Sequence, residues 1–275
     1  MIDNTDSNRT SPFAFTGDKF EIRSVGSTLN CSSVMTAINT MMAKILSDFK
    51  NEVDKKIDQG LKKDEAIFEI LRKFIIASKK IRFDGDGYSK EWEKEAKKRG
   101  LSNVPKSVYA YEEMIGETSV KLFSDMKVMS KSELEARYNI NVENYQKIIQ
   151  IEARVLGDIA INHIIPTALN YQTELLKNVQ SLKEVLGDGV GVKTQIQTIR
   201  EISDRVEAIH QKVAALVEER KKLNPVKNTE KRAKLYCEKV IPYFEEIRYE
   251  ADKLEQIVDD KLWPLPKYRE LLFAR

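Results

Sequence analysis

The sequence predicts a mainly α-helical protein with one β-strand near its N-terminus and a long antiparallel helical bundle in its second half. Apolar residues recur every three to four positions from residue 30 almost to the C-terminus, which is the period of a helix with one buried face. Only residues 19–25 alternate with the two-residue period of a strand. Short breaks join the long helical stretches, so each apolar stripe must find its partner in an antiparallel neighbour.

The predicted strand at 19–25 carries the charged side chains Lys19, Glu21 and Arg23 on one face, because residues two apart on a strand point to the same side. Taken alone, this face is either a solvated ion-pair surface or a site where an acidic metal ligand stands beside an arginine fork for a carboxylate or phosphate. In the second interpretation, a turn over residues 12–17 brings Arg9 close to the strand.

Three helices are predicted between the strand and residue 100. Residues 30–60 and 64–80 carry apolar stripes at helical spacing, and Gly60 ends the first of these helices. Ser89 is placed to cap a short charged helix, which Gly100 ends.

The second half of the chain predicts the bundle. Ser130 and Glu133 form a capping box, in which each side chain satisfies a backbone donor of the first helical turn, so a helix should start at Lys131. The apolar pattern then persists to residue 186, and Pro166 should kink this helix because proline removes a backbone donor.

Two further helices complete the predicted bundle. Residues 187–191 form a glycine-rich hinge. Isoleucine, valine and leucine then step by three and four over residues 196–216 like a coiled-coil seam, typical of a core or an oligomer contact, until Pro225 closes the segment. The last long helix covers residues 233–258 and is expected to be interrupted at Pro242.

Composition restricts the function classes. The chain has 275 residues, 41% of them hydrophobic, and 46 basic against 43 acidic residues give a net charge of +3. Neither nucleic acid nor a membrane is expected as a partner, since the charges are interspersed and no apolar run approaches the roughly 20 residues that span a bilayer. A cytoplasmic location is expected, with Cys31 and Cys237 as buried, reduced thiols.

Two other motifs favour ordinary structure. The loop that starts at Asp84 has acidic residues where a calcium loop begins and ends, but Tyr88 replaces an oxygen ligand and Ser89 replaces the required glycine. His163 and His210 stand on separate predicted helices without the spacing of metal ligands.

A family resemblance favours the functional interpretation of the charged strand. The stretch NRTSPFAFTGDKFEIR, followed by GSTLNCSSVMTAINTMMAKI, resembles the glutamine synthetases, which carry an Asn-Arg-Ser/Thr element, a strand of the form Arg/Lys-x-Glu-x-Arg and then a helix. Three later stretches look specifically like the C-terminal part of the type III enzymes: RFDGDGYSKEWEKEAKKRGLSN, ELEARYNINVENYQKIIQIEARVLGDIAINHIIPTALNYQ and LWPLPKYRELLFAR. The similarity covers essentially the whole chain, in order.

The resemblance also implies what this chain lacks. In that family a β-grasp domain and most of the catalytic domain supply the other metal-binding glutamates, a metal-binding histidine and the nucleotide contacts. The chain is therefore expected to be a C-terminal part that begins just before one active-site strand. Residues 1–155 would be the end of the catalytic domain with its closing helices, and residues 156–275 a type III-like helical extension.

The activity implied by the resemblance is that of an ATP-dependent glutamate–ammonia ligase. ATP phosphorylates the γ-carboxylate of glutamate, ammonia then displaces phosphate, and Mg²⁺ or Mn²⁺ ions clamp the phosphoryl oxygens. Glu21 matches the strand glutamate that binds one metal, and Arg23 matches the arginine that holds glutamate. Arg9 matches the arginine that contacts substrate and ATP phosphates. Lys19 stands where an arginine is common, so it departs from the family pattern at that phosphate contact.

The resemblance implies a homo-oligomeric ring for the complete protein, with active sites completed at subunit boundaries. The chain alone is expected to be inactive. Two alternatives stay open: a stand-alone helical scaffold or regulatory protein that lost the chemistry, and one half of a split enzyme that is completed in trans by another chain.

Overall fold

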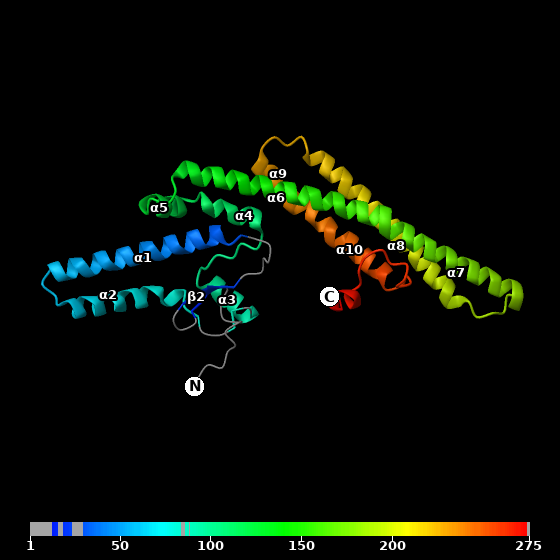
Figure 1. Ribbon diagram of the computed structural model, residues 1–275, viewed down its shortest axis with the longest axis horizontal. Coiled ribbons are helices and arrows are strands. Elements are labelled where there is room, and N and C mark those ends of the chain that lie inside the picture. Colours follow the sequence, from blue (N-terminus) through cyan, green and yellow to red (C-terminus); the bar gives the residue numbers. More distant parts are fainter. Residues whose placement is uncertain (1–12, 16–18, 24–29, 84–85, 88, 274–275) are drawn as a thin grey trace, which may run out of the picture. The chain divides into compact units, whose positions relative to one another are not determined.

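The computed structural model describes residues 13–15, 19–23, 30–83, 86–87 and 89–273. This described part is mainly helical, as predicted (Figure 1). The chain divides into two compact units, Met1–Glu135 and Ala136–Arg275.

The first unit opens with a two-stranded antiparallel sheet. Strand β1 (Phe13–Phe15) pairs with β2 (Phe20–Ile22), with Ala14 opposite Glu21. Strand β2 lies inside the predicted span of 19–25 and is shorter than it, whereas β1 was not predicted.

A helical hairpin follows the sheet. Helix α1 (Ser32–Asp58) turns at Gly60, whose φ of 94° is left-handed, and packs beside α2 (Lys63–Ala77). Both helices match their predicted spans closely, and α2 continues as the short 3₁₀ helix η2 (Ser78–Lys80). The buried core of the hairpin lies close to the turn and consists of Val53, Ala66 and Ile70.

Short helices complete this unit: α3 (Lys90–Lys98), α4 (Ser107–Ala110), the 3₁₀ helix η3 (Tyr111–Met114) and α5 (Glu117–Asp125). The Ser89 side chain accepts a hydrogen bond from the backbone N–H of Trp92 at 3.1 Å, so the predicted cap is confirmed. Gly100, with φ of 77°, follows the end of α3 as predicted.

Helix α6 (Lys131–Ile159) begins at the predicted residue. The backbone N–H of Ser130 donates to Glu133 Oε2 at 2.8 Å, and the N–H of Glu133 donates to Ser130 Oγ at 3.3 Å, which confirms the capping box. The helix runs through the boundary between the compact units and also past residue 155, where the sequence analysis placed its domain boundary. That family-based division stays a prediction.

The second unit is the predicted antiparallel bundle. Helix α6 continues through the π-helical turn η4 (Ala160–Ile164) into α7 (Ile165–Leu186), and the chain returns as α8 (Lys193–Leu223). Helix α9 (Thr229–Leu235), the π-helical turn η5 (Tyr236–Val240) and α10 (Ile241–Glu255) follow, before the short α11 (Tyr268–Leu272). Helices α7 and α10 both pack against α8.

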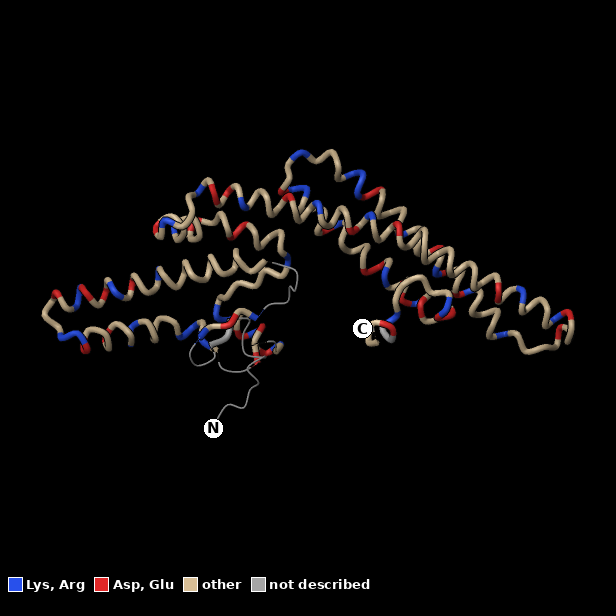
Figure 2. The backbone as a smooth tube through the Cα atoms, viewed as in Figure 1, with Lys and Arg blue, Asp and Glu red and all other residues tan. Residues whose placement is uncertain are grey.

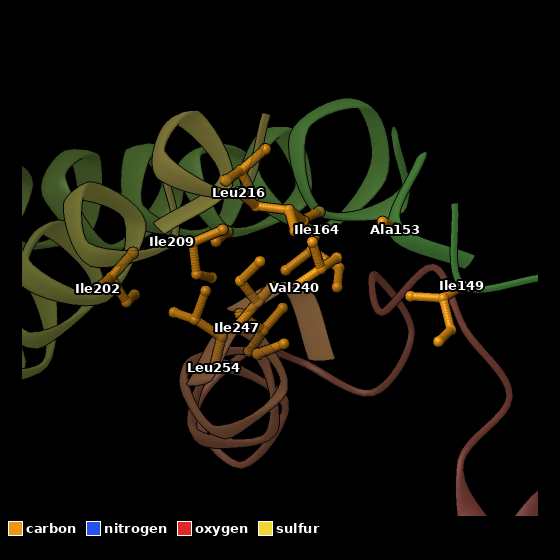
Figure 3. Packing of buried hydrophobic residues seen from close by; sticks show 14 of the residues in the cluster. Ile149, Ala153, Ile164, Ile202, Ile209, Leu216, Val240, Ile247 and Leu254 are labelled. Carbon is orange, nitrogen blue, oxygen red and sulfur yellow. The ribbon is translucent and has the colours of Figure 1, made fainter. Parts of the chain in front are cut away.

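The core of this bundle forms along the seam predicted within residues 196–216. Figure 3 shows the side chains of α8 meeting those of η5 and α10. Three residues on each side repeat at intervals of seven, and all six are fully buried: Ile202, Ile209 and Leu216 against Val240, Ile247 and Leu254. The seam therefore forms the core of its own bundle.

A π-helical turn precedes each of the two helix prolines, and the kink expected at Pro166 stays a prediction. A π-helical turn ends just before Ile165-Pro166, and another ends just before Ile241-Pro242. Proline cannot donate to the carbonyl one turn earlier and its ring crowds that carbonyl, whereas a wider π turn gives it room. The expected interruption at Pro242 is therefore wrong, because the helical run continues through it into α10.

The cysteines fulfil their prediction only in part. Cys237 is buried in η5, but Cys31 is exposed where it precedes α1, so the expectation of two buried thiols is wrong for Cys31.

Within the described ranges, no helix has both the length and the apolar character needed to cross a bilayer.

Candidate active-site strand

The charged residues predicted to share a face of the strand do meet at β2. Arg23, directly after the strand, approaches Glu21 Oε2 with Nη2 at 2.9 Å and with Nε at 3.2 Å. Lys19, directly before the strand, places Nζ 3.6 Å from Glu21 Oε1. The prediction that the three side chains gather on one side of the strand is confirmed.

This cluster is partly exposed and contains two cations and one carboxylate. The side chain of Arg23 is 21% exposed, that of Glu21 36% and that of Lys19 64%. Ion pairs with this much exposure contribute about 0–1 kcal/mol, so stability gives little reason to hold two cations around one carboxylate. Two cations beside one carboxylate suit an incoming anion such as a carboxylate or a phosphate.

The residues at β2 do not make a metal centre by themselves. A carboxylate oxygen is a suitable ligand for Mg²⁺ or Mn²⁺, but both oxygens of Glu21 face cations here. Across the described part of the chain, no three His, Cys, Asp or Glu side chains gather as a metal site would require. A metal at Glu21 would need to displace these contacts and find its other ligands elsewhere.

Arg9, the remaining predicted site residue, lies outside the described residues. Its role at the strand stays a prediction.

A second cluster in the first unit was not predicted. Arg99, at the end of α3, donates to Glu95 Oε1 at 2.8 Å and to the carbonyl oxygen of Arg82 at 2.8 Å. The rings of Phe83 and Trp92 stack with centroids 4.0 Å apart, and Arg99 lies over the Trp92 ring. The spacing of Glu95 and Arg99 by four residues was the only sign of it in the sequence. The cluster ties α3 to the segment that follows α2.

The bundle holds a third charged cluster, around Glu250 of α10. Its carboxylate accepts hydrogen bonds from Arg205 and Lys212 of α8, each at 2.8 Å, and the side chain is only 10% exposed. Burial would raise the pKa of the Glu250 carboxyl, but the hydrogen bonds from Lys212 and Arg205 outweigh burial and hold the pKa below its ordinary value. This cluster links two helices of the core and has the character of a structural contact.

Comparison with known proteins gives the family context of both units. Residues 66–183, from α2 to near the end of α7, match the model of the glutamine synthetase C-terminal domain. The chain is 47% identical over 281 residues to a glutamine synthetase of Bacteroides fragilis (strain YCH46). It is 35% identical over 279 residues to the type-3 glutamine synthetase of Dictyostelium discoideum, and 29% identical over 279 residues to a glutamine synthetase of Butyrivibrio fibrisolvens.

These matches cover almost all of this chain but a minor part of each relative. They span 100% of the chain and 38% of the Bacteroides protein, and 99% of the chain and 37% of the Dictyostelium protein. The part of each relative outside the match is thus longer than this chain.

Proposed function

We propose that this chain, which is similar along its whole length to glutamine synthetases, works as the C-terminal part of an ATP-dependent glutamate–ammonia ligase of type III. The similarity to the Bacteroides enzyme, which covers all of this chain, carries this proposal. The reaction would join ammonia to glutamate through a γ-glutamyl phosphate, and the complete protein would act as a homo-oligomeric ring. The chain alone would be inactive, because it spans 38% of that relative's length.

The contribution of this chain to the site would be the charged side of β2. Arg23 would hold the carboxylate of glutamate, since a planar guanidinium can donate two parallel hydrogen bonds. Its close contact with Glu21, 2.9 Å from Nη2 to Oε2, supports the proposal because it places the fork beside the proposed metal ligand, and a bound metal would displace this contact. Lys19 would add positive charge near the phosphates, and Arg9 would contact substrate and ATP.

Glu21 would serve as one ligand of a divalent metal in the complete enzyme. The metal, when bound, would neutralise charge on the phosphoryl oxygens of ATP. The remaining ligands would come from the part of the protein that this chain does not span.

The test is an assay of glutamine formation from glutamate, ammonia and ATP with Mg²⁺. We would compare the purified chain with the chain co-expressed with the unmatched part of the Bacteroides enzyme. Arg23→Ala is the test variant, and Arg154→Ala, an exposed arginine of α6, is the matched control. We expect activity only from the combination, abolished by Arg23→Ala and kept by Arg154→Ala.

Two results would contradict the proposal. Glutamine formation by the chain alone would show that it carries a complete site. A stable combination that forms no glutamine would favour the scaffold interpretation, in which the chemistry has been lost.

A further inference from the structure

The turn between helices α8 and α9 carries the strongest concentration of positive charge in the sequence. Residues 220–234, which cover the end of α8, the turn and most of α9, contain seven basic residues and one acidic residue. Because the whole chain has 46 basic and 43 acidic residues, the rest of it carries more acidic than basic residues. Figure 2 shows blue residues gathered around this turn. We name residues 220–234 the basic segment.

Three of the seven cations are paired with glutamates nearby in the sequence, and four are not. The pairs are Lys221 with Glu218, Lys222 with Glu219 and Lys234 with Glu230. Within the described part of the chain, the side chains of Arg220, Lys227 and Lys231 form neither an ion pair nor a hydrogen bond. The side chain of Arg232 donates to the carbonyl oxygen of Val226 at 3.1 Å. The basic segment therefore has positive charge available for an anionic partner.

The two arginines of the basic segment have already lost part of their hydration. The Nε atoms of Arg220 and Arg232 are buried, and neither has a hydrogen-bond acceptor among the described residues. Removing water from a cation is a major cost of binding an anion, and here part of that cost falls on folding and not on binding. A carboxylate suits these side chains, because a guanidinium can donate to both of its oxygens together.

Side-chain hydrogen bonds hold the turn of the basic segment in place. The hydroxyl of Tyr236, which is fully buried, donates to Asn224 Oδ1 at 3.2 Å. Asn228 caps α9, since its side chain accepts a hydrogen bond from the backbone N–H of Lys231 at 2.7 Å. A turn that is fixed in this way loses little conformational entropy when it binds a partner. The basic segment is therefore a preformed surface.

The surroundings of the basic segment restrict what it can bind. The structure describes every residue from 187 to 248, and none of them is a large apolar residue with an exposed side chain. A membrane is therefore a poor partner, since basic segments that dock on lipid usually also insert apolar side chains. Single-stranded nucleic acid is a poor partner as well, since its bases stack on aromatic side chains.

A protein segment rich in aspartate and glutamate fits the basic segment better. Glu218, Glu219 and Glu230 lie beside the cations and would repel a nucleic-acid backbone, whose charges are all negative. A protein segment can instead present an N–H group or a lysine to each of these glutamates. We infer that the basic segment docks an acidic segment of a partner protein. This contact goes beyond the proposed ligase activity and does not depend on it.

Fluorescence anisotropy with a labelled peptide tests the inference on the chain as it is. The probe is a peptide of aspartate and glutamate, and its control is the same peptide with asparagine and glutamine in their place. We expect the chain to bind the acidic peptide and not the amide peptide. Binding should weaken at least about tenfold when salt rises from about 50 mM to about 500 mM, because ions screen exposed charges. No binding of the acidic peptide at low salt would overturn the inference.

Charge reversal locates the contact on the chain. The test variant combines Lys227→Glu with Lys231→Glu, and the matched control combines Lys177→Glu with Lys193→Glu, which are exposed lysines of α7 and α8. Both variants change the net charge equally, and both should keep the helical circular dichroism of the wild type. We expect the test variant to bind the acidic peptide at least about tenfold more weakly, and the control to stay within about twofold of the wild type. Equal losses would show that the peptide responds to overall charge alone, and would overturn the inference.

Competing anions and the complete assembly provide the last comparisons. A single-stranded RNA with the same charge as the peptide and vesicles of phosphatidylserine would be titrated in the same way, and tighter binding of either one would overturn the inference. The chain co-purified with the unmatched part of the Bacteroides enzyme should bind the peptide as the chain alone does. A loss there would show that another part of the enzyme covers the basic segment, and would also overturn the inference. None of these measurements uses glutamine formation, so a failure of the proposed activity would leave this inference in place.

Discussion

At the residue scale, the contact between Arg23 and Glu21 makes a sharp prediction about geometry. Arg23→Lys keeps the charge but loses the planar fork that meets a carboxylate with two hydrogen bonds. We expect the rate of glutamine formation by the co-expressed combination to fall about 100-fold, in the range seen when one preorganised donor is removed. Steady-state kinetics on Arg23→Lys and on Arg154→Lys would measure it. If both variants kept a rate within twofold of the wild type, Arg23 would have no role in binding the substrate carboxylate.

Glu250 allows a prediction about stability and pH. Glu250→Gln keeps the shape but removes the charge that faces Arg205 and Lys212, each at 2.8 Å. We expect a loss of about 2 kcal/mol in the free energy of unfolding, below the usual cost of breaking a buried pair because the two cations are about a quarter exposed. Urea titration at neutral pH would give the difference, with Glu246→Gln on the same helix as control.

The pH dependence of this difference follows from the sign of the shift. The folded-state pKa of Glu250 is depressed, so its stabilisation is complete above the unfolded pKa of about 4.3 and is lost as pH falls through the folded pKa. The difference in the free energy of unfolding between the wild type and Glu250→Gln should therefore decrease in urea titrations below about pH 4. A gap that stays constant down to pH 3 would contradict this account.

At the element scale, the capping box of α6 tests a local rule. Ser130→Ala removes the oxygen that accepts from the backbone N–H of Glu133. We expect the free energy of unfolding to fall by about 1 kcal/mol, the usual cost of losing a helix cap. Ser181→Ala, at an exposed position within α7, should not destabilise the chain, because alanine has the better helix propensity. Equal effects of the two substitutions would argue against the cap.

The elements also show what the sequence could predict. Helices that begin after a capping serine start where the sequence predicted. Ser89 caps α3 and Ser130 caps α6. Strand β1 was missed because three residues are too few to show an alternation. The π-helical turns were missed because a wider turn has no sequence signal of its own, and proline alone predicts a break.

The candidate site could be predicted from the sequence only as far as neighbours along one strand. Residues two apart on a strand must share a side, so the meeting of Lys19, Glu21 and Arg23 followed from spacing alone. The ligands that would complete the proposed metal site could not be found in the same way, because spacing along one strand says nothing about side chains elsewhere in the fold. The Arg99 cluster depends on contacts between segments far apart in sequence, which a local pattern does not record.

At the scale of the whole molecule, the two compact units should differ in stability. Among the described residues, the buried cluster of the α1–α2 hairpin has three members, whereas that of the bundle has sixteen. We expect calorimetry of the chain to show two transitions, with the first unit melting at the lower temperature. Ile70→Ala should lower the temperature of the first transition only, and Ile209→Ala that of the second only. Each substitution should reduce the free energy of unfolding of its unit by about 2–5 kcal/mol, the usual cost of truncating a buried isoleucine to alanine.

The control for this experiment is Ile151→Ala, which truncates an exposed isoleucine and should move neither transition. A single transition that responds equally to Ile70→Ala and Ile209→Ala would mean that the units unfold as one cooperative body.

The π-helical turns have a consequence for how this bundle can change in evolution. Each wide turn accommodates about one residue more than an α-helical turn, so it absorbs an extra residue without changing the phase of the helix that follows. Removing one residue from Ala160–Ile164 would therefore let this segment close as a regular α-helix, and buried Ala168 and Val179 of α7 would keep their side of the helix. Removing one residue from the regular part of α8 would instead rotate everything after it by about 100° and turn part of the seam out of the core. We expect single-residue deletions to be tolerated in the π-helical turns and in the 187–191 turn, and to be rejected within α8.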